Sequence, residues 1–136
     1  MKQKQRVIFV CTHNSSRSQM AEGLLRQNAG DRYEVFSAGT VATKVNPLAI
    51  KAMAEKGIDI SHHTSDHIDK YMGMEFDYVI TVCDNANETC PYFPTTKTQW
   101  HWSFEDPSAG GGTEEERLAK FREIRDQIEQ RLQVSL

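Results

Sequence analysis

Apolar residues recur along the chain in two patterns, as short runs and at a spacing of three or four. Short, mostly apolar runs that are rich in β-branched or aromatic side chains predict buried strands. They lie at residues 6–11, 33–38, 76–82 and 98–102. Segments with an apolar residue every three or four positions predict amphipathic helices. They span residues 18–29, 47–57 and 113–132.

Residues with strong preferences for helix ends mark two of these boundaries. Asn46 and Pro47 fit the N-cap and the first helical position of the second helix. Thr113 and Glu116 have the spacing of a capping box at the start of the last helix. These residues indicate both helix starts independently of the hydrophobic pattern.

The order of the elements predicts the fold class. Strands separated by helices imply parallel pairing through right-handed crossovers. We therefore predict one α/β domain over residues 1–136, a three-layer open sheet of about four parallel strands with helices on both faces. Ligands of such sheets bind at the carboxyl ends of the strands, where we expect Cys11 and Cys83 to lie.

Composition narrows the possible functions. The 136 residues are 38% apolar and 26% charged, with a formal net charge of −3. Scattered basic residues in an acidic chain argue against nucleic-acid binding. No apolar run approaches the roughly twenty residues of a membrane span, and the first residues lack the pattern of a signal peptide. We therefore expect a cytoplasmic protein, monomeric by default, with neither a membrane nor a nucleic-acid partner.

The three cysteines are an odd number and too few for a disulfide scaffold, which leaves catalysis or metal binding. The first cysteine opens the segment CTHNSSRS, between the first predicted strand and the first predicted helix. A loop that leads from a strand onto a helix N-terminus turns backbone N–H groups toward an anion. The predicted oxyanion-binding residues are Thr12, His13, Asn14, Ser15, Ser16, Arg17 and Ser18.

The same segment predicts a nucleophile. Arg17 offers paired N–H groups to a tetrahedral oxyanion. The positive field of the loop and helix favours the thiolate form of Cys11, which makes it a candidate nucleophile. Ser18 is a candidate hydrogen-bond donor to that sulfur, and Asn14 is a candidate for a left-handed turn. The alternative is structural, with Cys11 as a buried strand end, Arg17 as a solvated charge and the serines as helix caps.

Cys83 and Cys90 stand seven positions apart in the segment VCDNANETCPYFP. Zinc sites usually space their cysteines by about two to four residues, so this spacing favours a redox pair over a metal site. Seven helical steps cover about 10.5 Å, whereas a disulfide needs Cα atoms within about 7 Å. A helix over residues 84–89 would therefore have to unwind when the disulfide forms. The alternative is a buried strand end and an exposed bystander.

The segment CTHNSSRS, with Asp106 and Pro107 late in the chain, resembles the low-molecular-weight protein tyrosine phosphatase superfamily over essentially the whole length. The two further cysteines resemble those of its thioredoxin-coupled arsenate reductases. The resemblance implies that Cys11 attacks arsenate, that Cys83 attacks Cys11, and that Cys90 attacks Cys83, leaving a disulfide that thioredoxin reduces. It also implies that Asp106 is the general acid; a turn-forming aspartate is the alternative.

A tyrosine phosphatase is the alternative function within the superfamily. It would use the same loop and acid but needs no further cysteines. Phosphatases of this type usually carry tyrosines after the Asp-Pro pair, where this chain has Ser108 and Ala109. The absence of an aromatic wall favours a small inorganic oxyanion such as arsenate, with residual phosphatase activity.

The resemblance further implies a potassium ion beside the anion loop; no cofactor is required for the reaction. The matching oxygen donors are Asn14, Glu22, Ser37 and Asp66. Oxygen ligands suit a hard cation, but each residue is equally compatible with a cap or a surface position. The histidines of residues 62–67 (HHTSDH) are interpreted as solvated polar surface rather than as metal ligands.

Overall fold

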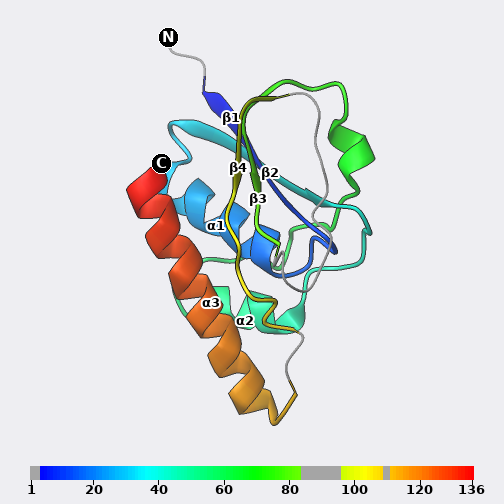
Figure 1. Ribbon diagram of the computed structural model, residues 1–136. Helices are drawn as coiled ribbons and strands as arrows, with labels where there is room; N and C mark the ends of the chain where they lie inside the picture. The colour runs from blue at the N-terminus through cyan, green and yellow to red at the C-terminus, as the bar shows by residue number, and fades with distance from the viewer. Residues whose placement is uncertain (1–3, 84–95, 109–110) are drawn as a thin grey trace.

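The computed structural model describes residues 4–83, 96–108 and 111–136 (Figure 1). Its elements, in chain order, are β1 (Gln5–Cys11), α1 (Arg17–Ala29), β2 (Tyr33–Gly39), α2 (Pro47–Ala54), the 3₁₀ helix η1 (Ile68–Tyr71), β3 (Phe76–Thr81), β4 (Thr96–His101) and α3 (Glu114–Ser135). All of the strands and helices that the hydrophobic pattern predicts are present, with their ends shifted by three residues at most.

The described strands form one sheet in the order β2-β1-β3-β4, and every neighbouring pair is parallel. This arrangement confirms the α/β class and the predicted sheet. Because the strands are parallel, β1, β2 and β3 finish at the same edge of the sheet. At that edge Cys11 of β1 lies opposite Gly39 of β2, and Val10 lies opposite Thr81 of β3.

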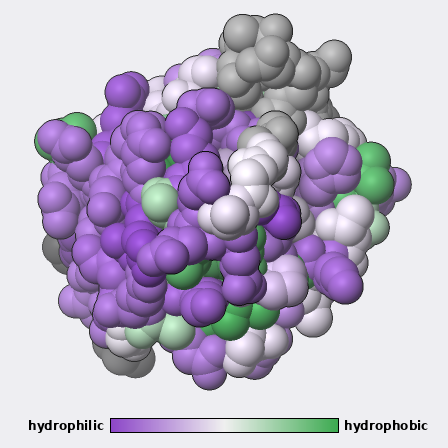
Figure 2. All heavy atoms as spheres, turned by 90° about the horizontal axis from the view of Figure 1, so that it is seen from below, coloured by the Kyte–Doolittle hydropathy of each residue, from purple (hydrophilic) through white to green (hydrophobic). Residues whose placement is uncertain are grey.

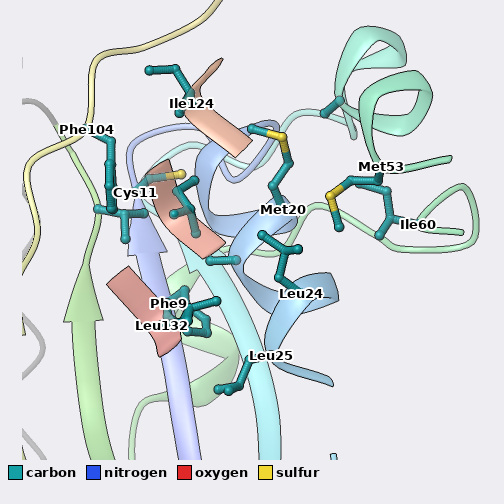
Figure 3. Packing of buried hydrophobic residues seen from close by; sticks show 14 of the residues in the cluster. Phe9, Cys11, Met20, Leu24, Leu25, Met53, Ile60, Phe104, Ile124 and Leu132 are labelled. Carbon is teal, nitrogen blue, oxygen red and sulfur yellow. The ribbon is translucent and has the colours of Figure 1, made fainter. Parts of the chain in front are cut away.

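The helices α1, α2 and α3 share one face of the sheet (Figures 1 and 3). Phe9 of β1 packs there in one cluster with Met20 and Leu24 of α1 and with Phe121 and Ile124 of α3, all fully or almost fully buried. The helical spacing of these apolar residues turns them toward the sheet. Each such side chain contributes roughly 1.5–3 kcal/mol by leaving water, so this layer holds the strand ends in place.

The opposite face of the sheet has a smaller apolar cluster. Ile8 and Val10, which alternate with Phe9 along β1, pack there with Phe76, Val79 and Tyr71 of η1. In the part of the chain that the structure describes, this face is covered by the single 3₁₀ turn η1 and not by an α-helix. The reason lies in the preceding residues 61–67, which are polar and lack the repeating apolar positions that would bury a longer helix.

The expected helix caps are present. Asn46 Oδ1 accepts a hydrogen bond from Leu48 N at 2.9 Å. Thr113 Oγ1 accepts from Glu116 N at 3.1 Å, and the Glu116 carboxylate accepts from Thr113 N at 3.3 Å, which completes the capping box. Both predicted helix starts are therefore confirmed.

Figure 2 shows the molecule from below, the side toward which the carboxyl ends of the strands point in Figure 1. This surface is mostly hydrophilic, with small separate hydrophobic patches. Among the residues that the structure describes, no helix has both the length and the apolar character that a membrane crossing requires.

Candidate active site

The loop that joins β1 to α1 is pressed against the end of β2. A Cβ atom on Gly39 would lie 2.6 Å from Thr12 O, 2.8 Å from Asn14 N and 2.9 Å from Cys11 O. Real Cβ contacts do not reach such distances, so only glycine fits at this position. Gly39 is a residue that sequence reasoning missed, because nothing in the local sequence shows that another backbone passes over it.

The carbonyl groups of this loop all point outward. Each accepts a hydrogen bond from a group outside the loop. Thr12 O accepts from Val41 N at 2.9 Å, and His13 O accepts from Thr43 Oγ1 at 3.2 Å. Asn14 O accepts from Gln19 Nε2 at 3.1 Å, and Ser15 O accepts from Asn46 N at 2.9 Å. Because the N–H and C=O of a trans peptide point in opposite directions, the N–H edges of the loop face its concave side. Such inward N–H groups are the basis of an anion-binding nest.

Cys11 Sγ lies at the base of this nest and is almost fully buried. Asn14 N donates to the sulfur at 3.2 Å, and Ser18 Oγ lies 2.9 Å from it. Asn14 has a φ of +49°, the left-handed conformation that the sequence predicts, and this turn brings its N–H toward the sulfur. These contacts would stabilise negative charge on the sulfur.

Arg17 begins α1 and is 3% exposed. Its Nη1 donates to Phe104 O at 3.1 Å, and its Nη2 lies 3.8 Å from Asp106 Oδ2. Asp106 Oδ1 accepts from Ser108 N at 2.9 Å and from Ser108 Oγ at 2.7 Å. The alternative of a solvated Arg17 is therefore wrong, because the guanidinium is buried between the loop and residues 104–106.

A small hollow of about 10 Å³ opens where these groups meet. It is lined by Cys11, His13, Ser15, Ser16, Arg17, Asp106 and Ser108. Ser16 Oγ is buried and has no hydrogen-bond partner among the described residues. A buried hydroxyl without a partner is costly in a folded protein, so this atom indicates that the hollow receives a polar ligand. Asn14 and Ser18 instead support Cys11 from behind.

Cys83 follows β3 and is fully buried. Its Sγ lies 3.9 Å from Val10 O, on the residue before Cys11, and Val82 N donates to the same Val10 O at 2.9 Å. Cys83 therefore lies at the carboxyl edge of the sheet, as expected, beside the end of β1. Cys90, and the segment 84–89 expected to unwind on oxidation, lie outside the described residues.

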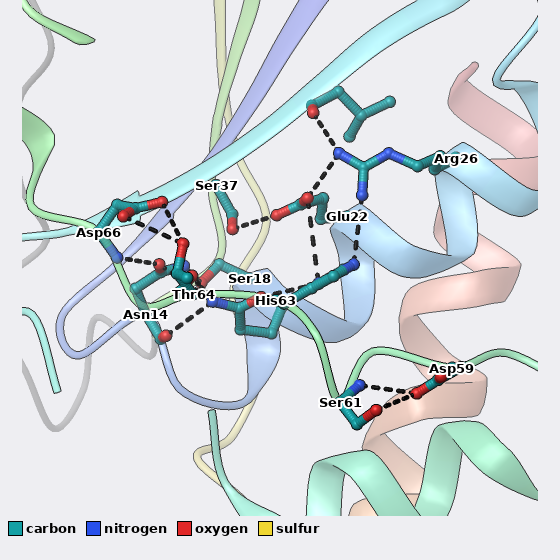
Figure 4. A network of polar contacts seen from close by, with 12 residues as sticks. Asn14, Ser18, Glu22, Arg26, Ser37, Asp59, Ser61, His63, Thr64 and Asp66 are labelled. Carbon is teal, nitrogen blue, oxygen red and sulfur yellow. Dashed lines mark hydrogen bonds and ion pairs between the residues drawn. The ribbon is translucent and has the colours of Figure 1, made fainter. Parts of the chain in front are cut away.

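The expected cation ligands belong to one polar network (Figure 4). Ser37 Oγ donates to Glu22 Oε1 at 2.5 Å, and Asp66 N donates to Asn14 Oδ1 at 2.8 Å. Arg26 Nη2 pairs with Glu22 Oε2 at 2.6 Å, which neutralises part of the negative charge. These groups offer hard oxygen donors, so their chemistry fits an alkali cation.

The interpretation of the histidines as solvated surface is wrong for His63. Its side chain is only 6% exposed and packs against α1, in contact with Gln19 and Arg26. Burial lowers the pKa of His63; the nearby Glu22 carboxylate opposes that shift, whereas Arg26 adds to it. Sequence pattern could not find this residue, because its burial depends on the path of residues 58–66 across α1.

Comparison with known proteins identifies the family. The family model described as low molecular weight phosphotyrosine protein phosphatase matches residues 6–135. The arsenate reductase of Halalkalibacterium halodurans is 49% identical over 129 residues, which cover 95% of this chain and 93% of that protein.

Solved structures agree with this match. An arsenate reductase in the phosphate binding state has a TM-score of 0.81 and 36% identity, over 95% of this chain and 94% of the other. The thioredoxin-dependent arsenate reductase of Corynebacterium glutamicum has a TM-score of 0.62 and 28% identity, over 98% of this chain and 64% of the other. The chain therefore belongs to the low molecular weight phosphotyrosine protein phosphatase family.

Proposed function

We propose that this protein is an arsenate reductase, an enzyme that converts arsenate to arsenite. The observation that carries the proposal is the position of Cys11 Sγ beneath inward N–H groups, with Arg17 and Asp106 at the same hollow. Relatives that match almost the whole chain are named arsenate reductases. One of them is described in a phosphate binding state, and phosphate has the tetrahedral shape and charge of arsenate.

In the first step, the Cys11 thiolate attacks arsenic in the bound arsenate. A sulfur–arsenic bond forms and an arsenic–oxygen bond breaks, while Asp106 gives its proton to the departing oxygen. Arg17 and the loop N–H groups hold the remaining oxygens and their charge. Support for this role of Asp106 comes from its carboxylate, which lines the hollow 3.8 Å from the guanidinium that would hold the anion.

In the second step, the Cys83 thiolate attacks Cys11 Sγ. A disulfide forms between the two cysteines, and the electron pair of the sulfur–arsenic bond stays on arsenic, which leaves as arsenite. Support comes from the parallel pairing of β1 and β3, which puts both cysteines at the same sheet edge. Cys90 then attacks Cys83 Sγ, releases the Cys11 thiolate and forms the last disulfide.

A dithiol protein must reduce that disulfide, and we propose thioredoxin. The Corynebacterium glutamicum relative carries thioredoxin dependence in its name. Exchange by a thioredoxin dithiol oxidises two thiols for each disulfide reduced, so the electrons balance over one turnover. The relay requires reduced cysteines at the start of each cycle, and we therefore propose the cytoplasm as its compartment.

We also propose potassium as a supporting ion, held by Asn14, Glu22, Ser37 and Asp66. An ion there would help to orient Asn14, whose backbone N–H reaches Cys11. Exchange of potassium for choline at constant ionic strength is expected to lower the unfolding midpoint and kcat/KM of the parent protein. The same exchange should have little effect on Glu22→Gln, and an equal response of both proteins would contradict the site.

Phosphate-ester hydrolysis is the second candidate, since the family is described as a phosphatase. The loop and Asp106 would serve that reaction equally well. Ser108, however, follows the Asp106-Pro107 pair and offers no aromatic surface to a phosphotyrosine ring. We therefore expect at most weak hydrolysis of aryl phosphates, independent of the two later cysteines.

A coupled assay tests the proposal. Reduced protein is mixed with arsenate, thioredoxin, thioredoxin reductase and NADPH, and NADPH oxidation is followed for the parent and for Cys11→Ser, Cys83→Ser and Cys90→Ser. We expect arsenate-dependent turnover in the parent and its loss in all three variants. Among the three cysteines, hydrolysis of p-nitrophenyl phosphate should depend on Cys11 and not on Cys83 or Cys90. Turnover that survives Cys83→Ser and Cys90→Ser would contradict the relay.

A further inference from the structure

Gln19, near the start of α1, is fully buried and its amide nitrogen faces three oxygens. Gln19 Nε2 lies 3.1 Å from Asn14 O, 3.1 Å from Asn14 Oδ1 and 2.8 Å from Thr64 O. Backbone carbonyl oxygens only accept hydrogen bonds, so the group that faces them must be the NH₂ of the amide. Gln19 Oε1 therefore points the other way, where His63 Nδ1 lies 3.0 Å from it.

The neighbours of His63 determine which ring nitrogen carries hydrogen. Gln19 Oε1 is an acceptor, so His63 Nδ1 must donate to it. On the other side of the ring, Arg26 Nη1 lies 3.2 Å from His63 Nε2, and a guanidinium only donates. His63 is therefore neutral, with hydrogen on Nδ1 and a lone pair on Nε2.

The direction of hydrogen bonding continues from Gln19 to the sulfur. Asp66 N and Gln19 Nε2 both donate to Asn14 Oδ1, which leaves Asn14 Nδ2 to donate to Ser18 Oγ at 2.7 Å. Ser18 Oγ accepts that hydrogen bond and keeps its own hydrogen available for Cys11 Sγ, 2.9 Å away, where a thiolate could only accept it. Asn14 N also donates to the sulfur at 3.2 Å, so a Cys11 thiolate in this position would accept hydrogen bonds from both groups.

We infer that Gln19, oriented by His63, is a positioning residue that holds Asn14 so that Ser18 donates its hydrogen to the Cys11 thiolate. The inference rests on the proposed function, in which Cys11 is the nucleophile. Asn14 needs this support because few non-glycine residues adopt a positive φ. Gln19 Nε2 contacts both the backbone oxygen and the side-chain oxygen of Asn14. It also contacts Thr64 O, in the segment before η1.

The pH dependence of Cys11 alkylation tests the inference without arsenate. The rate of reaction with iodoacetamide is measured in the full chain carrying Cys83→Ser and Cys90→Ser, so that Cys11 is the cysteine that reacts. Adding Gln19→Met keeps the side-chain length but removes both hydrogen-bonding groups. We expect the pH of half-maximal rate to rise by about one unit, the size of a lost hydrogen bond to a charged group. The control is Gln27→Met, an exposed glutamine of the same helix, which should leave the profile unchanged.

A pair of His63 variants separates positioning from general packing. In His63→Asn, the side-chain amide nitrogen overlays the position of His63 Nδ1 and can donate to Gln19 Oε1. The pH profile of Cys11 alkylation in this variant should therefore stay close to that of the parent. His63→Leu cannot donate, and its profile should rise as for Gln19→Met. Equal profiles for His63→Leu, His63→Asn and the parent would overturn the inference. This pair also decides the matter if circular dichroism shows Gln19→Met to be unfolded.

The two proposals fail in different ways. A parent protein whose alkylation follows the profile of an ordinary thiol would contradict the proposed role of Cys11 itself. A parent with an acid-shifted profile that neither Gln19→Met nor His63→Leu displaces would overturn only the positioning role.

Discussion

The guanidinium of Arg17 and the carboxylate of Asp106 approach to 3.8 Å across the hollow beside Cys11. Arg17 is buried, whereas the side chain of Asp106 is 29% exposed. An arriving oxyanion would compete with Asp106 for the guanidinium, because two negative groups at close range repel each other. In the proposed first step, protonation of Asp106 would relieve that repulsion and supply the proton for the departing oxygen.

Replacement of Arg17 by lysine is expected to lower kcat/KM for arsenate about a hundredfold. Lysine keeps the charge but cannot offer paired N–H groups, and it loses the contact of Arg17 Nη1 with Phe104 O. Initial rates in the coupled thioredoxin assay measure the loss. Arg122→Lys, on the exposed side of α3, is the control and should retain parental rates. Parental activity in Arg17→Lys would show that the paired geometry is not used.

Asp106→Asn separates proton donation from binding. The amide cannot donate a proton in the first step, so the rate of that step should fall between about a hundredfold and ten-thousandfold. Affinity for arsenate should be kept or increased, because the competing negative charge is gone. Single-turnover measurements of the first step, with arsenate affinity from calorimetry, separate the two effects. The neighbouring Glu105→Gln, whose carboxylate pairs with Lys120, should change neither quantity.

Gly39→Ala is expected to damage the anion loop although the change adds one methyl group. The new Cβ would meet Thr12 O at 2.6 Å and Asn14 N at 2.8 Å, and the backbone on both sides must move. The free energy of unfolding should fall by about 1–3 kcal/mol, and arsenate reduction should fall with it. Urea unfolding and the coupled assay measure both. Gly111→Ala, where a Cβ meets open space, should be neutral, and similar behaviour of the two variants would count against the close approach.

The stability of the protein should depend on pH through His63. The folded-state pKa of His63 lies below its usual value because burial outweighs the opposing effect of the Glu22 carboxylate, and Arg26 adds to the lowering. The unfolded chain therefore binds a proton at higher pH than the folded chain. Stability should fall as pH drops below about 6.5, and the fall should end once pH passes below the folded pKa.

Comparison of variants isolates this contribution. The slope of unfolding free energy against pH is at most about 1.4 kcal/mol per pH unit for one proton. Urea titrations between pH 7.5 and 5.5, at constant potassium, should give a smaller slope for His63→Asn than for the parent. Gln27→Met, at an exposed position of α1, leaves every titratable group in place and should keep the parental slope. Equal slopes for His63→Asn and the parent would mean that His63 does not titrate differently in the two states.

Much of the fold could be predicted from sequence because the responsible signals are local. The apolar run at residues 6–11, the helical spacing from Met20 to Leu24, and the caps at Asn46 and Thr113 each depend on side chains within a few positions of one another. The loop from Cys11 to Ser18 could be found for the same reason, since its strand and helix flank it directly. The covering of the second sheet face by η1 could not, because it depends on how a polar segment crosses the sheet.

The site beyond the loop depends on contacts between distant segments. Gly39 and Gln19 carry no motif, and His63 lies in a polar segment that predicts exposure. In the structure, however, Gly39 lies against the anion loop, Gln19 contacts Asn14, and His63 contacts Gln19. Only the packing of the loop before η1 against α1 makes His63 a buried, neutral donor.

The amino-acid sequence by itself determined the α/β class, the order of the elements and the candidate nucleophile with its neighbouring arginine. These follow from periodicity and from preferences that act over a few residues. The tertiary structure alone decided that Asp106 reaches Arg17, that Cys83 lies beside the end of β1, and which groups meet behind Cys11. The physical reason is that such contacts join groups far apart in the chain, whose meeting is set by sheet pairing and helix packing and not by local preference.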